Sequence, residues 1–216
     1  MKSLLPMPIL LSALTLAVSG CSELDRLTTP PLEMTVELKS PVAAETTLTL
    51  SGNGLNETYT DNGTGLSTKA SVWPGSYTAT LSRLSVGPIV YQGVLAFSNA
   101  NGNLSRTESL VFQVRSIDSG KLKIAGSYQA VTGSLQVKAT GLPFGTQPKL
   151  SYQGADGVKK PFDPTQPASL SPGNYQIAFE AVTVGGRTYT PNPTTMVVAV
   201  QAGAYAPVEV TYTEAP

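Results

Sequence analysis

Two stretches decide the fold of this chain: residues 73–81 read WPGSYTATL, and residues 171–179 read SPGNYQIAF. In both, a Pro-Gly pair is followed by apolar and polar side chains in alternation. Proline sets φ to about −65° and glycine accepts a positive φ, so the pair favours a type II turn. A period of two is typical of a strand with one buried and one wet face. Both stretches therefore predict a turn that leads into a β-strand, with Tyr77 and Tyr175 on the inward face.

The similarity between the two halves extends beyond these stretches. Val86-Gly87 and Tyr91 align with Val184-Gly185 and Tyr189 without a gap. Further on, the alignment requires an insertion in the first half, within residues 92–107. Two copies indicate a tandem of domains, because a solenoid needs three or more repeats.

We predict an all-β chain of two tandem antiparallel immunoglobulin-like β-sandwiches, each of about seven strands. The first sandwich is expected over residues 34–128 and the second over residues 134–216, and the short linker predicts an end-to-end arrangement with limited bending. Residues 1–20 read as a signal segment and residues 21–33 as a polar, proline-rich tether. Prolines and charges are expected to blunt the edges of the sheets.

The N-terminal segment carries a targeting signal. Lys2 precedes an apolar stretch over residues 4–18, and small residues lead to the single cysteine of the chain, Cys21. A membrane-spanning helix needs about 20 apolar residues, and the two prolines and the polar residues after position 18 argue against one. The pattern is that of a signal peptide.

The residues Val18-Ser19-Gly20-Cys21 resemble a bacterial lipobox. The resemblance implies cleavage after Gly20, a lipid on Cys21 and attachment to a membrane of the cell envelope. Three acyl chains anchor a protein stably, since one chain alone binds only marginally. Ser22 favours the outer membrane under the sorting rule of some bacteria. An ordinary secretory signal, with Cys21 merely nearby, is the alternative.

The composition excludes most catalytic chemistry. Charged residues make up 13% of the chain, and 14 basic residues balance 14 acidic ones, so nucleic-acid binding has no electrostatic support. The chain has no histidine, which rules out a Ser-His-Asp or Cys-His relay and every imidazole ligand for a metal. The acidic residues are scattered, so no carboxylate pair can be placed. We therefore expect a non-catalytic protein without a cofactor.

The Ser-Pro-Gly-x-Tyr element, the Val-Gly-x-x-x-Tyr element and the final Val-x-Val-x-Tyr strand resemble carboxypeptidase-regulatory-like (transthyretin-like) and Cna-B-like domains. Some Cna-B-like domains carry a lysine–asparagine isopeptide crosslink between the first and last strands. Lys39 and Lys138 lie on expected first strands, but the expected last strands, 121–128 and 206–213, contain no asparagine or aspartate. We therefore expect no crosslink, and both lysines on an outer face.

Calcium is the one metal left to consider, because hard cations take oxygen ligands. Asn53, Glu57 and Asp61 are the candidate ligands, and residues 99–103 hold three asparagines without an acidic residue among them. Neither stretch has the EF-hand spacing. The alternative is that asparagine and glycine serve only to form turns there.

Two aromatic residues distinguish the first half from the second. Trp73 stands where the second half has Ser171, and Phe97 lies within the inserted residues. Because loops carry contacts more often than cores do, Trp73 and Phe97 are the candidate partner contacts. The alternative for Trp73 is a ring that lies over the edge of its own domain.

Two functions remain open. The first is a non-catalytic, membrane-anchored envelope lipoprotein that presents its two domains as a spacer or as a docking module for an envelope protein. The second is a glycan-binding or adhesive surface lipoprotein that uses Trp73 and nearby aromatic residues such as Tyr91 or Phe97.

Overall fold

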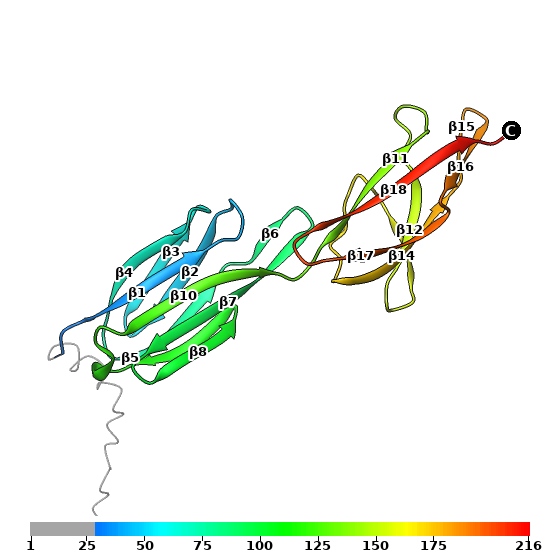
Figure 1. Cartoon of the computed structure of the whole chain (residues 1–216). Helices are drawn as coiled ribbons and strands as arrows, with labels where there is room; N and C mark the ends of the chain where they lie inside the picture. Colours follow the sequence, from blue (N-terminus) through cyan, green and yellow to red (C-terminus); the bar gives the residue numbers. More distant parts are fainter. Residues whose placement is uncertain (1–28) are drawn as a thin grey trace, which may run out of the picture.

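The computed structural model of the chain describes residues 29–216, which form two β-sandwiches joined end to end (Figure 1). The all-β prediction is confirmed. Cys21 and Gly20 lie outside the described residues. Within residues 29–216, the one helix is a single 3-10 turn, Ser116–Asp118, and none is long and apolar enough to cross a membrane.

The first sandwich contains two sheets. One has the strand order β4-β1-β10-β7-β6, with β8 paired to β7, and the other has the order β3-β2-β5-β9. The strands are β1 (Leu32–Lys39), β2 (Thr46–Gly52), β3 (Leu55–Asp61), β4 (Leu66–Val72), β5 (Gly75–Leu81), β6 (Leu84–Val86), β7 (Ile89–Asn99), β8 (Gly102–Thr107), β9 (Ser109–Val114) and β10 (Leu122–Ala130).

The second sandwich repeats this plan with fewer strands. Its sheets have the orders β11-β18-β16-β15 and β13-β12-β14-β17. The strands are β11 (Ser134–Thr140), β12 (Lys149–Gln153), β13 (Lys159–Phe162), β14 (Gly173–Glu180), β15 (Val182–Val184), β16 (Arg187–Asn192), β17 (Thr195–Val200) and β18 (Tyr205–Glu214). The second half thus has no counterpart of β4 or β8.

In both halves the first strand runs parallel to the last. Met34 lies opposite Leu122 in the β1–β10 pair, and Leu135 lies opposite Ala206 in the β11–β18 pair. The other strand pairs of the described chain are antiparallel. The parallel pair arises because the chain crosses to the other sheet between its first and last strands.

The apolar residues that recur with a period of two in the sequence form the inward face of each strand. On β5 the side chains of Tyr77, Ala79 and Leu81 are buried, and on β18 those of Val208 and Tyr212 are buried. Each half forms its own hydrophobic cluster. A fully buried aliphatic or aromatic side chain contributes about 1.5–3 kcal/mol, so each half has the core of an independent sandwich.

The short linker is hydrogen-bonded to both sandwiches. The chain passes between them through Val131, Thr132 and Gly133. In the first half, the Val90 N–H donates to Thr132 Oγ1 at 2.8 Å, and Thr132 Oγ1 donates to the Pro88 carbonyl at 3.2 Å. In the second half, Ser169 Oγ donates to Thr132 Oγ1 at 2.9 Å. The Gly203 N–H donates to the Thr132 carbonyl at 2.8 Å. Thr132 is therefore bonded to both bodies.

The two edges of the β13-β12-β14-β17 sheet differ in how they are protected. β13 carries Lys159, Lys160 and Pro161, which discourage the addition of another strand. β17 reads TMVVAV, without a charge or a proline, and Val197 on its outer face is 70% exposed. β17 is therefore an open edge.

Candidate functional site

The two matching Pro-Gly elements are each closed by a tyrosine. The Tyr77 hydroxyl donates a hydrogen bond to the Trp73 carbonyl at 2.8 Å and accepts one from the Trp73 N–H at 3.0 Å. The Tyr175 hydroxyl donates to the Ser171 carbonyl at 2.9 Å. The expected type II turns are wrong: the glycines that begin β5 and β14 have φ of 157° and 155°, not the roughly 80° of that turn. The tyrosine side chain closes the loop instead.

In the first half, a side chain covers this corner. Asn53, in the turn between β2 and β3, donates from Nδ2 to the Pro74 carbonyl at 3.0 Å. A methyl group added to Gly75 would come within 2.9 Å of Asn53 Nδ2. Tyr77 below is only 1% exposed. The corner of the first sandwich is therefore sealed.

In the second half, the same corner is open. The connection between β12 and β13 is longer, and a methyl group added to Gly173 would meet nothing within 4 Å. The result is a groove of about 370 Å³. Its lining residues are Tyr152, Gly154, Ala155, Asp156, Lys160, Ser169, Leu170, Ser171, Pro172, Gly173, Asn174 and Tyr175.

Two half-buried tyrosines form one wall of this groove, which we call the tyrosine groove. The rings of Tyr152 and Tyr175 meet edge to face, with centroids 5.9 Å apart and an interplanar angle of 64°. Tyr152 takes the place of Leu50, since each lies opposite the matching position of the next strand. A methyl group added to Gly154 would lie 2.8 Å from Tyr175 Cε1. Glycine at 154 therefore leaves room for the ring.

Polar groups surround the tyrosines. Lys160 Nζ donates to Asp156 Oδ2 at 2.7 Å, and the Val158 N–H donates to Asp156 Oδ1 at 3.1 Å. The hydrogen bond from Lys160 lowers the pKa of the Asp156 carboxyl, and the same contact raises the pKa of the Lys160 ammonium. Both groups therefore stay charged at neutral pH. Asn174 is exposed beside them.

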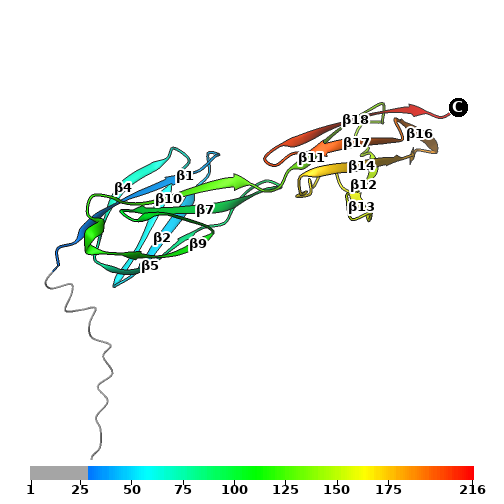
Figure 2. The ribbon, with the colours of Figure 1, turned by 60° about the horizontal axis from the view of Figure 1, so that its bottom comes forward.

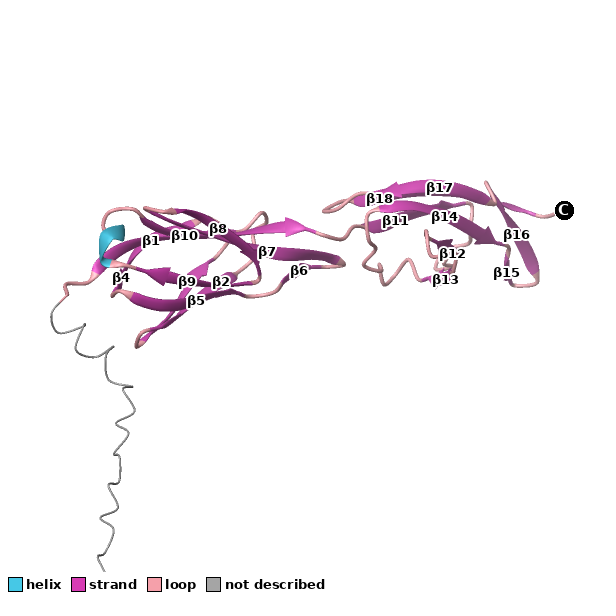
Figure 3. Ribbon diagram, turned by 90° about the horizontal axis from the view of Figure 1, so that it is seen from below, coloured by secondary structure: helices cyan, strands magenta, loops and turns pink. Residues whose placement is uncertain are grey.

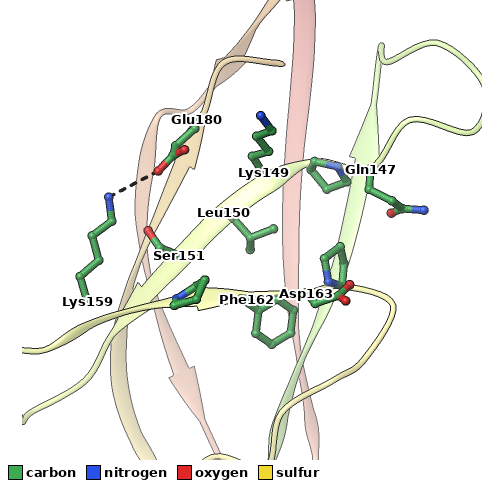
Figure 4. Close-up of a pocket in the computed structure, with 11 residues that line it drawn as sticks. Gln147, Lys149, Leu150, Ser151, Lys159, Phe162, Asp163 and Glu180 are labelled. Atoms are coloured by element: carbon green, nitrogen blue, oxygen red, sulfur yellow. Dashed lines mark ion pairs between the residues drawn. The ribbon is translucent and has the colours of Figure 1, made fainter. Parts of the chain in front are cut away.

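A second groove, of about 520 Å³, lies along β12 and β13 (Figure 4). Its apolar lining consists of Leu150, Phe162 and three prolines, Pro148, Pro161 and Pro164. Lys159 Nζ and Glu180 Oε1 form an ion pair at 3.6 Å. Ser151 Oγ is buried and has no hydrogen-bond partner among the described residues. This groove is an apolar hollow with an ion pair at its rim.

Phe97 is not a surface residue, so the expectation that it contacts a partner is wrong. It lies on β7, where the alternation turns Leu95 and Phe97 inward. Its side chain is 1% exposed and its ring stacks on Phe112, with centroids 4.1 Å apart. The inserted residues form a β-hairpin, with Asn99 opposite Gly102, and not a loop.

Trp73 is half-buried and stands beside the sealed corner of the first sandwich. Both its backbone N–H and its backbone carbonyl are hydrogen-bonded to the Tyr77 hydroxyl. A contact between Trp73 and a partner stays a prediction.

The three calcium candidates are not brought together. Asn53 precedes β3, whereas Glu57 and Asp61 lie in the middle and at the end of this strand. A strand rises about 3.3 Å per residue, so Glu57 and Asp61 are about 13 Å apart. Within residues 29–216, no group of three acidic, cysteine or histidine side chains is placed to hold a metal. The proposed calcium site is wrong, because extended backbone separates its members.

Asp61 instead binds the backbone of the residues around it. Its carboxylate accepts hydrogen bonds at Oδ1 from the N–H groups of Gly63, Thr64 and Gly65, at 3.0, 3.0 and 2.8 Å. Oδ2 accepts one from the Ser40 N–H at 3.1 Å. Burial would by itself raise the pKa of this carboxyl, but the four donors outweigh burial and lower the pKa.

Asp118 is a buried acidic residue that the sequence reasoning missed. It accepts hydrogen bonds from Asn99 Nδ2 at 3.5 Å, from Asn101 Nδ2 at 3.4 Å and from the Arg115 N–H at 2.9 Å. The asparagine run therefore does have an acidic neighbour, which tertiary folding supplies. The amide groups donate to the carboxylate, so these contacts join the β7–β8 hairpin to the helical turn.

The two lysines on the first strands are both exposed, as expected. Lys39 ends β1 and Lys138 lies on β11. Lys138 Nζ lies 3.9 Å from Glu209 Oε1.

Comparison with known proteins found no matching family model and no match among curated proteins. Three solved structures of pilus proteins are similar in part. The minor pilin of Streptococcus agalactiae is 10% identical, with 85% of this chain and 97% of that chain covered and a TM-score of 0.31. The major pilin T-13 of Streptococcus pyogenes is 12% identical, with 86% and 97% covered and a TM-score of 0.30.

The third is the pilus adhesin SpaC of Lactobacillus rhamnosus GG, which is 11% identical. The match covers 75% of this chain and 32% of the adhesin, at a TM-score of 0.31. Because all three TM-scores are this low, neither the fold nor the function of this chain is inferred from them.

Proposed function

We propose that this chain is a non-catalytic envelope protein with an anchored N-terminus, and that it acts as a spacer in which the second sandwich is held at a fixed distance from the first. The observation that carries the proposal is the junction at Thr132. A connection bonded to both bodies resists bending, whereas free linkers leave domains mobile. Figures 2 and 3 show the two sandwiches in line, viewed from two further sides.

The anchor that we propose is a lipid on Cys21, after cleavage at Gly20. The direction of the strands supports this role: β1 begins at the end of the first sandwich far from the junction, and the C-terminus lies at the far end of the second (Figure 1). A lipid at the N-terminus would therefore act at one end of the rod. We propose attachment to a membrane of the cell envelope, with the outer membrane favoured.

We further propose that the partner is an envelope protein. The open edge of β17 supports a docking role, since its backbone groups on that side face no neighbouring strand in the described chain. An extended segment can add to such an edge by main-chain hydrogen bonds.

The spacer role is tested by the distance distribution between spin labels at Gln113→Cys and Val197→Cys, two exposed positions in different sandwiches. We expect one narrow distance in a Cys21→Ser background, and a broader distribution after Thr132→Val. Thr80→Val, at an exposed position in the first sandwich, is the matched control and should leave the distribution narrow. A broad distribution in the parent protein would contradict a rigid spacer.

The anchor is tested separately by the intact mass and membrane fraction of the protein from bacterial cells. We expect a mass that fits cleavage after Gly20 plus acyl chains, and loss of membrane attachment in Cys21→Ser. Ser22→Ala keeps the cysteine and should stay acylated. An unmodified Cys21 in the membrane-bound protein would contradict the proposed lipid anchor. That result would not affect the spacer test.

A further inference from the structure

The two corners provide an internal comparison. The same Pro-Gly element carries Asn53 against it in the first sandwich, whereas the second leaves an open groove of about 370 Å³. Tyr77 is 1% exposed, but its counterpart Tyr175 is half-buried. Leu50 is fully buried, but its counterpart Tyr152 is half-buried. The second half has thus gained accessible tyrosine surface at a place that the fold itself does not require to be open.

We propose that the tyrosine groove of the second sandwich binds a neutral sugar residue of a glycan. This inference goes beyond the proposed spacer role and does not depend on it. The volume of the groove falls in the range of about 300–1,000 Å³ that is usual for ligand pockets. One pyranose ring with part of its neighbour is a ligand of suitable size.

The chemistry of the lining fits a hydroxylated ligand. A pyranose ring has apolar C–H faces, which pack on aromatic rings, and hydroxyl groups at its edge. Tyr152 and Tyr175 supply the aromatic surface. The Lys160 ammonium has three N–H donors and Asp156 occupies one of them, while the Asp156 carboxylate has about four acceptor positions and two are in use. Asn174 adds an amide that can donate and accept.

The charges favour a neutral ligand over a charged one. Lys160 and Asp156 are 2.7 Å apart and offset each other, so the groove presents no net charge from this pair. An acidic ligand would have to compete with Asp156 for Lys160. A proline-rich peptide is the other ligand that tyrosine grooves accept, and it docks on an aromatic lining. The tyrosine groove adds an ion pair and an amide to its aromatic wall, and these polar groups suit the hydroxyl groups of a sugar.

The test is saturation-transfer NMR on the full chain in detergent. The probes are the methyl glycosides of glucose, galactose, mannose and N-acetylglucosamine, with a proline-rich peptide as a comparison. We expect saturation of at least one glycoside. Tyr152→Leu, which restores the residue of the first half, should weaken binding by about tenfold or more. Asn174→Ala, at an exposed position, should weaken it several-fold without a change in melting temperature.

Trp73→Ala is the matched control in the first sandwich and should leave sugar binding unchanged. The proposal is overturned by any of four results: no glycoside is saturated, the peptide alone binds, Asn174→Ala and a folded Tyr152→Leu bind like the parent, or Trp73→Ala abolishes binding. The spin-label distances of the spacer test are independent of all four.

Discussion

At the corner before β5, the first sandwich places Asn53 against Gly75, whereas at the matching corner before β14 the second leaves Gly173 uncovered. The strands on either side follow the same order in both halves. The difference comes from the connection that faces the Pro-Gly element, which is a tight turn in the first half and a longer segment in the second. A repeated fold can therefore keep its core while one short connection decides whether a corner is sealed or open.

The first sandwich also contains stabilising contacts that have no counterpart in the second. The β7–β8 hairpin, the Phe97–Phe112 stack and the buried carboxylates of Asp61 and Asp118 all belong to the first sandwich. At the position of Phe112, which lies opposite Tyr77, the second half has the smaller side chain of Val198, opposite Tyr175. The first sandwich thus has the more extensive internal contacts, and the second sandwich has the tyrosine groove.

The largest expected effect comes from Phe97→Ala. Removal of a buried aromatic side chain costs about 3–5 kcal/mol, and the loss should fall on the first sandwich alone. Denaturant unfolding followed by fluorescence of Trp73, the single tryptophan, reports on this half. Hydrogen exchange of the second-half amides is the control and should be unchanged. Equal loss of stability in both halves would show that they unfold as one unit.

Asp61→Asn is expected to have the next largest effect, about 1.5–3 kcal/mol, because hydrogen bonds to a charged group are lost. The lowered pKa of Asp61 gives the sign of the pH dependence. Its contribution is present above the unfolded value of about 3.9 and is lost as the pH falls through the lower pKa of the folded state. Trp73 fluorescence should therefore show acid destabilisation of the first sandwich.

Asp61→Asn should remove this component of the acid sensitivity, and Asp156→Asn, an exposed aspartate in the second half, is the comparison variant. If acid unfolding of the first sandwich is the same with and without the Asp61 carboxylate, its hydrogen bonds do not contribute as described.

The smallest expected effect is the difference in stability loss between Tyr77→Phe and Tyr175→Phe. Tyr77→Phe removes the hydroxyl that donates one hydrogen bond to the Trp73 backbone and accepts another from it, at about 1–3 kcal/mol. Tyr175→Phe removes one hydrogen bond to Ser171 at a partly wet corner, at about 0.5–1.5 kcal/mol. Melting temperatures of the two variants compare the corners directly. A larger loss for Tyr175→Phe would contradict a sealed first corner.

Much of the fold follows from the sequence because strand faces obey a period of two. The alternation at Tyr77, Ala79 and Leu81 predicts which side chains are buried, and the repeat predicts two similar sandwiches. The same rule, applied to β7, also indicates that Phe97 faces inward with Leu95, once the insertion is taken as a strand. The lack of a counterpart in the second half instead suggested a loop.

The calcium and partner sites were less predictable, because side chains close in sequence on a strand are far apart in space. Glu57 and Asp61 are separated by extended backbone, whereas Asp118 reaches Asn101 across 17 positions of sequence. Nothing in the spacing of these residues indicates that contact.

The sequence by itself determined the all-β class, the tandem repeat and the buried face of each strand, since these depend on local periodicity. Only the tertiary structure decided which loop tips meet. Asn53 reaches the Pro74 carbonyl, whereas the matching connection of the second half leaves Tyr152 and Tyr175 accessible. Such contacts depend on the path that a connection takes between two strands, and local periodicity does not determine that path.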